Sequence, residues 1–177
     1  MTARQLHIGL LACSRTKADR PSLARELYVS PLFRAAREYA ENRYGQWLIL
    51  SARYGLVDPD QVLAPYFLSL RQLTARQREA WGDRIAIELT DRFPAGTVLW
   101  FHAGALYRDA IAPVVAHQVR FPLAGMGIGQ QLAWYRQHAR VARTVGLTIA
   151  SSKHCPPVPR PLAAIRHLAR AARGIWS

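Results

Sequence analysis

The chain has few of the residues that mark secreted, metal-binding or membrane proteins. Its two cysteines, Cys13 and Cys155, lie far apart and show no CxxC or CxxH spacing, which argues against a structural zinc site and a disulfide framework. No apolar run approaches the roughly 18 residues that span a bilayer, and the first one is too short for a signal peptide. These absences predict a cytoplasmic protein with free thiols, no metal and no membrane contact.

Lysine is also scarce, and acidic residues are missing from one end of the chain. Of the 24 basic side chains only Lys17 and Lys153 are lysines, and all eleven acids lie at or before Asp109. The last 68 residues therefore carry eight arginines, Lys153 and no acid, or +9 of the net charge of +13. Because guanidinium groups pair with phosphate oxygens, this distribution favours nucleic-acid binding. The alternative is a GC-rich genome that favours arginine codons, together with a solvated face, which would explain arginine in place of lysine but not the missing acids.

Two sets of arginines have the i, i+4, i+7 spacing that places side chains on one helix face. They are Arg136, Arg140 and Arg143, and Arg166, Arg170 and Arg173. Ordinary amphipathic helices with charged outer faces show the same pattern. We predict that both sets contact the phosphates of double-stranded DNA.

Apolar runs alternate with helical patterns along the first 150 residues. Buried strands are expected at 6–12, 46–51, 97–101 and, more weakly, 118–122. Helices are expected from Pro31 with Ser30 as cap, from Thr74 with Gln77 as capping box, near 105–116 and at about 130–143. This alternation predicts an α/β fold, with a mainly parallel, Rossmann-like sheet of about four or more strands flanked by helices.

The chain is expected to divide into a core and a tail. Residues 1–150 would form the α/β catalytic core. Residues 151–177 begin with the proline-rich "SSKHCPPVPRP" and continue as "PLAAIRHLARAARG", which predicts a linker and a basic C-terminal helix.

Small and polar residues follow each predicted strand. They are the segments 13–17, 51–55, 102–104 and 125–129. Ligands of such sheets bind beyond the carboxyl ends of the strands, so these segments predict a pocket at one edge. Gly125, Gly127 and Gly129 precede a helix, where their amides would hold a phosphate. They match neither GxGxxG nor a Walker loop, so no nucleotide cofactor is expected.

Several segments resemble known families. "ACSRTK", "ARELYVSPLFRAAREYA", "WLILSARYGLVDPDQVLAPYFLSL" and "PLAGMGIGQQLAW" resemble the DUF6884 family of small bacterial and phage proteins, over about residues 8–135. "LSARYGLVDPDQVLAPY" is more distantly similar to the peroxide-stress YaaA family. Cys13, Lys17, Tyr28 and Ser30 resemble the core motif of archaeosine synthase, in which a reactive lysine acts on a nitrile-bearing deazaguanine; Phe33 stands where that motif has a histidine.

These resemblances imply a function on nucleobases or DNA. YaaA-type proteins are associated with DNA binding and damage protection, archaeosine synthase modifies a tRNA base, and some small proteins of this group look like anti-phage DNA glycosylases. Together with the charge, they predict a DNA glycosylase that excises a modified nucleobase, as in hypermodified phage DNA. The alternatives are a non-catalytic DNA-binding stress or defence protein and an archaeosine-synthase-like transferase.

Lys17 and Asp58 are the expected reacting pair. A neutral Lys17 amine would displace the base and form a Schiff base with the opened sugar, and burial beside Arg15 and Arg20 would lower its pKa. Alternatively, water attacks with Asp58 as base or stabilising anion, and Lys17 binds phosphate. An exposed loop lysine and a turn aspartate before Pro59 are the plainer interpretations.

The remaining candidates are expected to line the base pocket or support it. Cys13 is a candidate reactive thiol, and its plainer interpretation is a small buried side chain. The other candidates are Ser14, Tyr28, Ser30, Ser51, Gly55, Tyr66, His102, Gly125, Gly127 and Gly129. The plainer interpretations are that Ser30 caps a helix, that the tyrosines are core residues and that His102 is a structural histidine.

Overall fold

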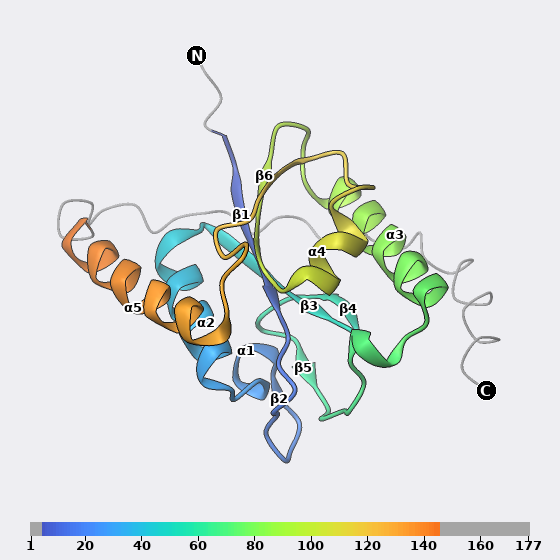
Figure 1. The fold of residues 1–177 in the computed structure, drawn as a ribbon, viewed down its shortest axis with the longest axis horizontal. Coiled ribbons are helices and arrows are strands. Elements are labelled where there is room, and N and C mark those ends of the chain that lie inside the picture. The colour runs from blue at the N-terminus through green and yellow to red at the C-terminus, as the bar shows by residue number, and fades with distance from the viewer. Residues whose placement is uncertain (1–4, 146–177) are drawn as a thin grey trace. The chain divides into compact units, whose positions relative to one another are not determined.

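Four parallel strands and one antiparallel strand form the central sheet of the computed structural model, which describes residues 5–145 (Figure 1). The parallel strands are β1 (His7–Ala12), β3 (Gln46–Ser51), β6 (Val98–His102) and β7 (Gln118–Arg120). Strand β4 (Gly55–Val57) runs antiparallel to β3, and the strand order is β4-β3-β1-β6-β7. The prediction of a mainly parallel α/β sheet is confirmed. The sheet is mixed because the chain turns back after β3.

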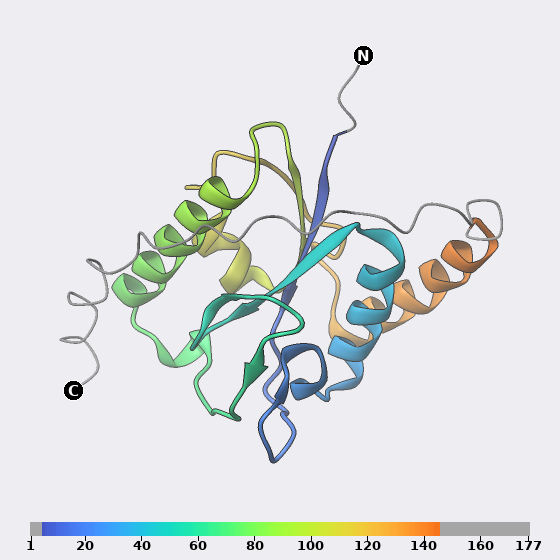
Figure 2. The ribbon, with the colours of Figure 1, turned by 180° about the vertical axis from the view of Figure 1, so that it is seen from behind.

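Helices cover both faces of the sheet (Figures 1 and 2). One face carries α2 (Pro31–Arg43), with α5 (Ile128–Val145) packed on it, and the other carries α3 (Ala75–Arg92) and α4 (Ala105–Ile111). Shorter elements lie near the carboxyl ends of the strands: α1 (Ala24–Leu27), the 3-10 helix η1 (Leu70–Gln72), and an antiparallel pair of β2 (Ser22–Leu23) with β5 (Val62–Leu63). The sequence patterns did not predict these short elements.

Side-chain caps begin two of the helices where the sequence predicts them. The Ser30 side chain accepts a hydrogen bond from the Phe33 N–H at 3.2 Å at the start of α2. At α3, the Thr74 N–H donates to the Gln77 side chain at 2.9 Å, and the Gln77 N–H donates back to Thr74 at 3.3 Å. Both caps satisfy amides that have no partner within the helix, so the local sequence determines where α2 and α3 begin.

The chain changes direction across the sheet on either side of β1. It leaves β1 through α2 to reach β3 on one side, and returns through α3 to β6 on the other. After β1 the chain therefore crosses to α2 on one face of the sheet, and after β6 it crosses to α4 on the opposite face. The crevice between the carboxyl ends of two such strands is the usual ligand position in parallel α/β sheets.

Part of the expected organisation falls outside the described residues. The tail at 151–177, including Arg166, Arg170 and Arg173, lies there. Within residues 5–145, no helix has the length and apolar character needed to span a bilayer.

Candidate functional site

Two hollows open at the carboxyl edge of the sheet and share Gly104. The first, which we call the switch-point cavity, has a volume of about 150 Å³ and lies beyond the ends of β1 and β6. Its polar lining residues are Cys13, Ser14, Ser30, His102, Gln131 and Tyr135. The second, which we call the Phe67 hollow, has a volume of about 690 Å³ and extends toward η1 and α4. Drug-sized ligands occupy pockets of about 300 Å³ or more, so the switch-point cavity suits a single small ring system.

A buried chain of three hydroxyl groups lies beside this edge. The Tyr66 hydroxyl is 2.7 Å from Ser51 Oγ and 3.0 Å from the Tyr28 hydroxyl. The Tyr54 N–H donates to Ser51 Oγ at 3.0 Å, and the Trp81 indole N–H donates to the Ser51 carbonyl at 3.1 Å. Burial raises the pKa of Tyr28 to about 12 and that of Tyr66 well above its usual range, so both hydroxyls are neutral. Three residues from separate parts of the sequence thus form one network.

Lys17 lies against this network. Its Nζ donates to the carbonyls of Ser14 at 3.0 Å and Arg15 at 3.3 Å, and lies 4.1 Å from the centre of the Tyr66 ring. A β-bridge between Lys17 and Tyr28 holds the lysine segment in place. Partial burial lowers the pKa of Lys17, while the nearby Cys13 acts in the opposite direction. A lysine in such surroundings deprotonates more readily than a solvated one.

Cys13 lies between the two hollows. Its Sγ is 3.2 Å from the hydroxyl of Tyr107, which lines the Phe67 hollow, whereas Cys13 itself lines the switch-point cavity. The Cys13 N–H donates to the Leu50 carbonyl at 3.0 Å, which fixes the end of β1 beside β3. Cys13 is half-buried.

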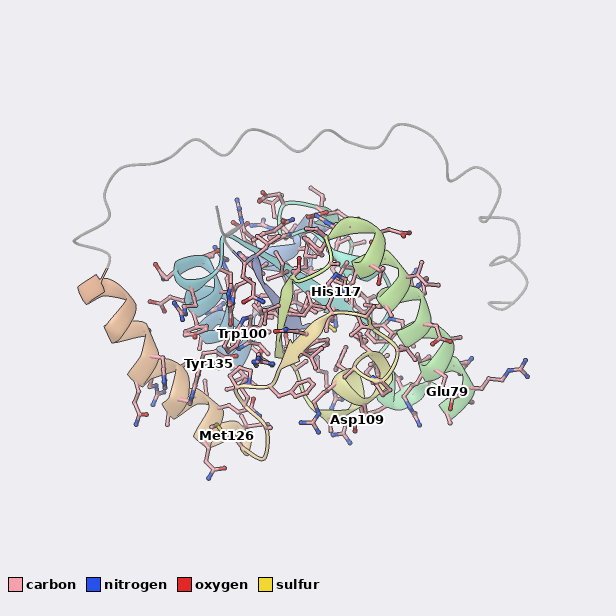
Figure 3. The ribbon with its side chains drawn as sticks, turned by 90° about the horizontal axis from the view of Figure 1, so that it is seen from above. Glu79, Trp100, Asp109, His117, Met126 and Tyr135 are labelled. Carbon is pink, nitrogen blue, oxygen red and sulfur yellow. The ribbon has the colours of Figure 1, made fainter. Side chains whose placement is uncertain are left out.

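His102 is buried between two tyrosines. Its Nε2 is 2.8 Å from the Tyr44 hydroxyl and its Nδ1 is 2.9 Å from the Tyr135 hydroxyl. Figure 3 shows Tyr135 on the side of α5 that faces the sheet. Burial lowers the pKa of His102 to about 3. The imidazole is therefore neutral, with one nitrogen donating and the other accepting, and it forms a fixed wall of the switch-point cavity.

Asp58 does not join Lys17, which corrects the prediction of a reacting pair. Strand β4 runs antiparallel to β3, with Gly55 beside Ser51 and Val57 beside Ile49, so it carries Asp58 back from the carboxyl edge. There Arg92, the last residue of α3, donates two hydrogen bonds to the Asp58 carboxylate, at 2.5 and 3.2 Å. The prediction assumed that the residues after Ser51 stay at the edge.

Comparison with known proteins places the chain in a family. The profile of a family described as "Family of unknown function (DUF6884)" matches residues 8–137. The chain belongs to the DUF6884 family. It is also similar to the "Uncharacterized protein YfjM" of Bacillus subtilis (strain 168), with 36% identity over 116 residues, which cover 63% of this chain and 77% of that protein. The family match at residues 8–137 includes the carboxyl ends of β1 and β6, where both hollows lie. The resemblance to DUF6884 is thereby confirmed.

The glycines expected at the site of this DUF6884 protein line neither hollow. Gly55 takes a φ of +79° in the turn between β3 and β4, which favours glycine for backbone reasons. Gly125 also has a positive φ, and the Gly127 N–H donates to the Gln130 side chain at 2.8 Å. Gly129 lies in the first turn of α5. These positions shape turns and a helix start, so we do not include them in the candidate site.

The expected phosphate-binding arginines are described in part. Arg136 is exposed on α5. Arg140 and Arg143 belong to the same helix, but their side chains lie outside the described residues. Within residues 5–145, no group of three or more His, Cys, Asp or Glu side chains is close enough to hold a metal ion.

The sequence patterns missed several residues that this family member brings to the site. Tyr107 contacts Cys13, and Tyr44 and Tyr135 hold His102. Tyr107 lies three residues after Gly104, on the first turn of the helix that follows β6. Its position just after the end of a strand could have identified it as a candidate site residue. Nothing local distinguishes Tyr44 or Tyr135 from other helix-associated aromatic residues.

The hydroxyl network supports a stability prediction. Tyr66→Phe should lower the free energy of unfolding by about 2 kcal/mol, because it leaves the Tyr28 hydroxyl and Ser51 Oγ with one partner fewer in a buried place. Tyr54→Phe is the matched control: its hydroxyl makes an exposed 3.3 Å bond to the Ala64 carbonyl and should contribute less than about 0.5 kcal/mol. Urea denaturation of both variants measures the difference. Equal losses would contradict a special role for the network.

Proposed function

We propose that this protein is a DNA glycosylase that removes a modified nucleobase by attack of the Lys17 amine. The observation that carries the proposal is the position of Lys17. This lysine is half-buried and has a lowered pKa. Its Nζ donates a hydrogen bond to the carbonyl of Ser14, a residue that lines the switch-point cavity. A base turned out of the DNA stack would occupy that cavity, with its sugar near Lys17. The resemblance to anti-phage glycosylases suggests cytoplasmic action on hypermodified phage DNA.

The charge around the two hollows supports a phosphate-bearing substrate. Among the described residues that line either hollow there is no aspartate or glutamate, whereas Arg15 and Arg71 line the Phe67 hollow. Arg136 and the net charge of +13 add to the attraction of a polyanion. The strand order around β1 suits a Rossmann-like assignment of the sheet, with the substrate at its switch point.

The proposed reaction begins with a neutral Lys17 amine. Its lone pair forms a bond to the sugar C1′ while the bond between C1′ and the base nitrogen breaks, and the base leaves with that electron pair and takes up a proton. Loss of a proton from Nζ and opening of the C1′–O4′ bond, with a proton passing to O4′, give a Schiff base. Water then hydrolyses the Schiff base, which releases an abasic site and restores the amine.

The amine route fits the described residues better than attack by water. A hydrolytic route needs a carboxylate as base or as a stabilising anion, and Asp58 was the candidate. Asp58 is instead paired with Arg92, away from the carboxyl edge. The neutral Tyr28 and Tyr66 hydroxyls orient groups at the edge without adding negative charge there.

Borohydride trapping tests the proposal. The full-length protein is incubated with several modified phage DNAs, and released bases are identified by mass spectrometry, with alkali-labile sites as a second readout. We expect base release and a covalent DNA adduct that maps to Lys17. Lys17→Ala should lose the adduct and slow single-turnover release by about 100-fold or more. Lys153→Ala removes the other lysine and should retain both.

Lys17→Arg separates a nucleophile from a phosphate-binding cation. It retains the positive charge, so undiminished base release by this variant would overturn the amine mechanism. Release without any adduct would point to water. DNA binding without release would identify the non-catalytic binder, and a lysine-bearing deazaguanine product would identify the transferase.

A further inference from the structure

The ring of Phe67 is unusually exposed for a large apolar side chain. Its exposed fraction is 95%, against 65% for Val62 and 63% for Ile87. It lies on the segment between β5 and η1, directly after the buried Tyr66 of the hydroxyl network. A solvated aromatic ring beside a hollow offers a flat apolar surface that gains from being covered.

The hollow beside Phe67 has the composition of a binding site for an anionic aromatic ligand. Its volume of about 690 Å³ is within the usual range for ligand pockets of about 300–1,000 Å³. Arg15 and Arg71 line it together with Ser69 and Gln72. Neither arginine forms an ion pair within residues 5–145, whereas Arg25, Arg37, Arg92 and Arg108 do. Two exposed guanidinium groups thus lie beside an exposed ring.

The Phe67 hollow adjoins the cavity that we assign to the excised base. Gly104 lines both, and Tyr107 of the hollow contacts Cys13 of the cavity at 3.2 Å. Arg15 is two residues from Lys17, which donates to its carbonyl. A ligand that fills both hollows would therefore carry two ring systems joined by a phosphate-bearing backbone.

We propose that the Phe67 hollow binds the nucleotide next to the excised one, with its base stacked on Phe67 and its phosphate between Arg15 and Arg71. Aromatic stacking tolerates any base, and guanidinium groups match phosphate oxygens. Binding of an aromatic ring with a phosphate is a property of the hollow itself. Its assignment to a nucleotide within DNA rests on the proposed function.

The first test measures binding and stacking with the full-length protein. The probes are a DNA duplex in which one strand carries 2-aminopurine beside a modified base, and free dAMP. Wild type should bind the duplex and change the 2-aminopurine fluorescence. Phe67→Ala should weaken binding about tenfold and lose the fluorescence change, and Phe67→Trp should retain both. Ile87→Ala, which removes an exposed apolar side chain on α3, is the matched control and should behave as wild type.

The second test measures the charge contribution. Arg71→Ala should reduce the slope of log K against log salt by about one. Arg43→Ala, at the end of α2 next to the start of β3, should leave the slope unchanged. An Arg71→Ala slope equal to that of wild type would overturn the phosphate contact.

The outcomes distinguish this inference from the proposed function. Unchanged binding and fluorescence in Phe67→Ala would overturn the inference even if base release proceeds. A Phe67-dependent response without any base release would support nucleotide binding in the Phe67 hollow and overturn the glycosylase. Phe67-dependent binding of dAMP but not of the duplex would overturn the assignment to DNA.

Discussion

Replacement of Gly82 by alanine should lower the free energy of unfolding by roughly 3 kcal/mol. Gly82 is buried in α3, where α4 crosses it. A Cβ at this position would lie 1.9 Å from the carbonyl oxygen of Ala110 and 2.7 Å from its carbonyl carbon. These are backbone atoms of α4, so no rotamer change relieves the overlap and the two helices must separate. Alanine's better helix propensity, worth about 1 kcal/mol, does not offset this cost.

Urea denaturation of Gly82→Ala against Gly129→Ala measures this effect. Gly129 is also helical, in the first turn of α5, but a Cβ there has no neighbour within 4 Å. Alanine at Gly129 should therefore stabilise the protein by about 0.5–1 kcal/mol. If Gly82→Ala were as stable as wild type, the close approach of α3 and α4 would be wrong. The site depends on that approach, because Trp81 of α3 and Tyr107 of α4 hold Ser51 and Cys13.

Acid should destabilise the protein through His102 by about 1.4 kcal/mol for each pH unit between pH 6 and pH 4. In the unfolded chain a histidine has its ordinary pKa of about 6.5. In the folded protein burial lowers the pKa of His102 to about 3. Below pH 6.5 the unfolded state therefore binds a proton that the folded state does not. The contribution of His102 to the free energy of unfolding is therefore fully present above pH 6.5 and is lost as the pH falls toward 3.

Two histidine variants separate this effect from general acid denaturation. His102→Gln removes the titrating group, so its free energy of unfolding should be lower at pH 7 but fall less steeply between pH 6 and pH 4. His138→Gln removes an exposed histidine of α5 and should retain the wild-type slope. Urea denaturation at several pH values provides both curves. Parallel curves for wild type and His102→Gln would show that His102 binds a proton as readily in the folded protein as in the unfolded chain.

Sequence alone determined the main strands and where α2 and α3 begin. The apolar runs of β1, β3 and β6 and the caps at Ser30 and Thr74 depend on residues a few positions apart, so their physics is local. The parallel order of the strands then follows from the helical crossovers. Because parallel strands end at the same edge of a sheet, the segments after Ala12, Ser51 and His102 were expected to lie together. At that edge the structure brings together Lys17, Tyr28, Ser51 and Tyr66.

Tertiary structure decided which of these residues meet. Asp58 was misplaced because the turn at Gly55 sends β4 back along β3, and a three-residue strand leaves no periodic signal. Contacts between distant elements also determine three other features of the site. They are the pairing of Cys13 with Tyr107, the burial of His102 between Tyr44 and Tyr135, and the exposure of Phe67 beside Arg71. Such contacts form only when the helices pack on the sheet, because side-chain direction and burial are properties of the packed chain.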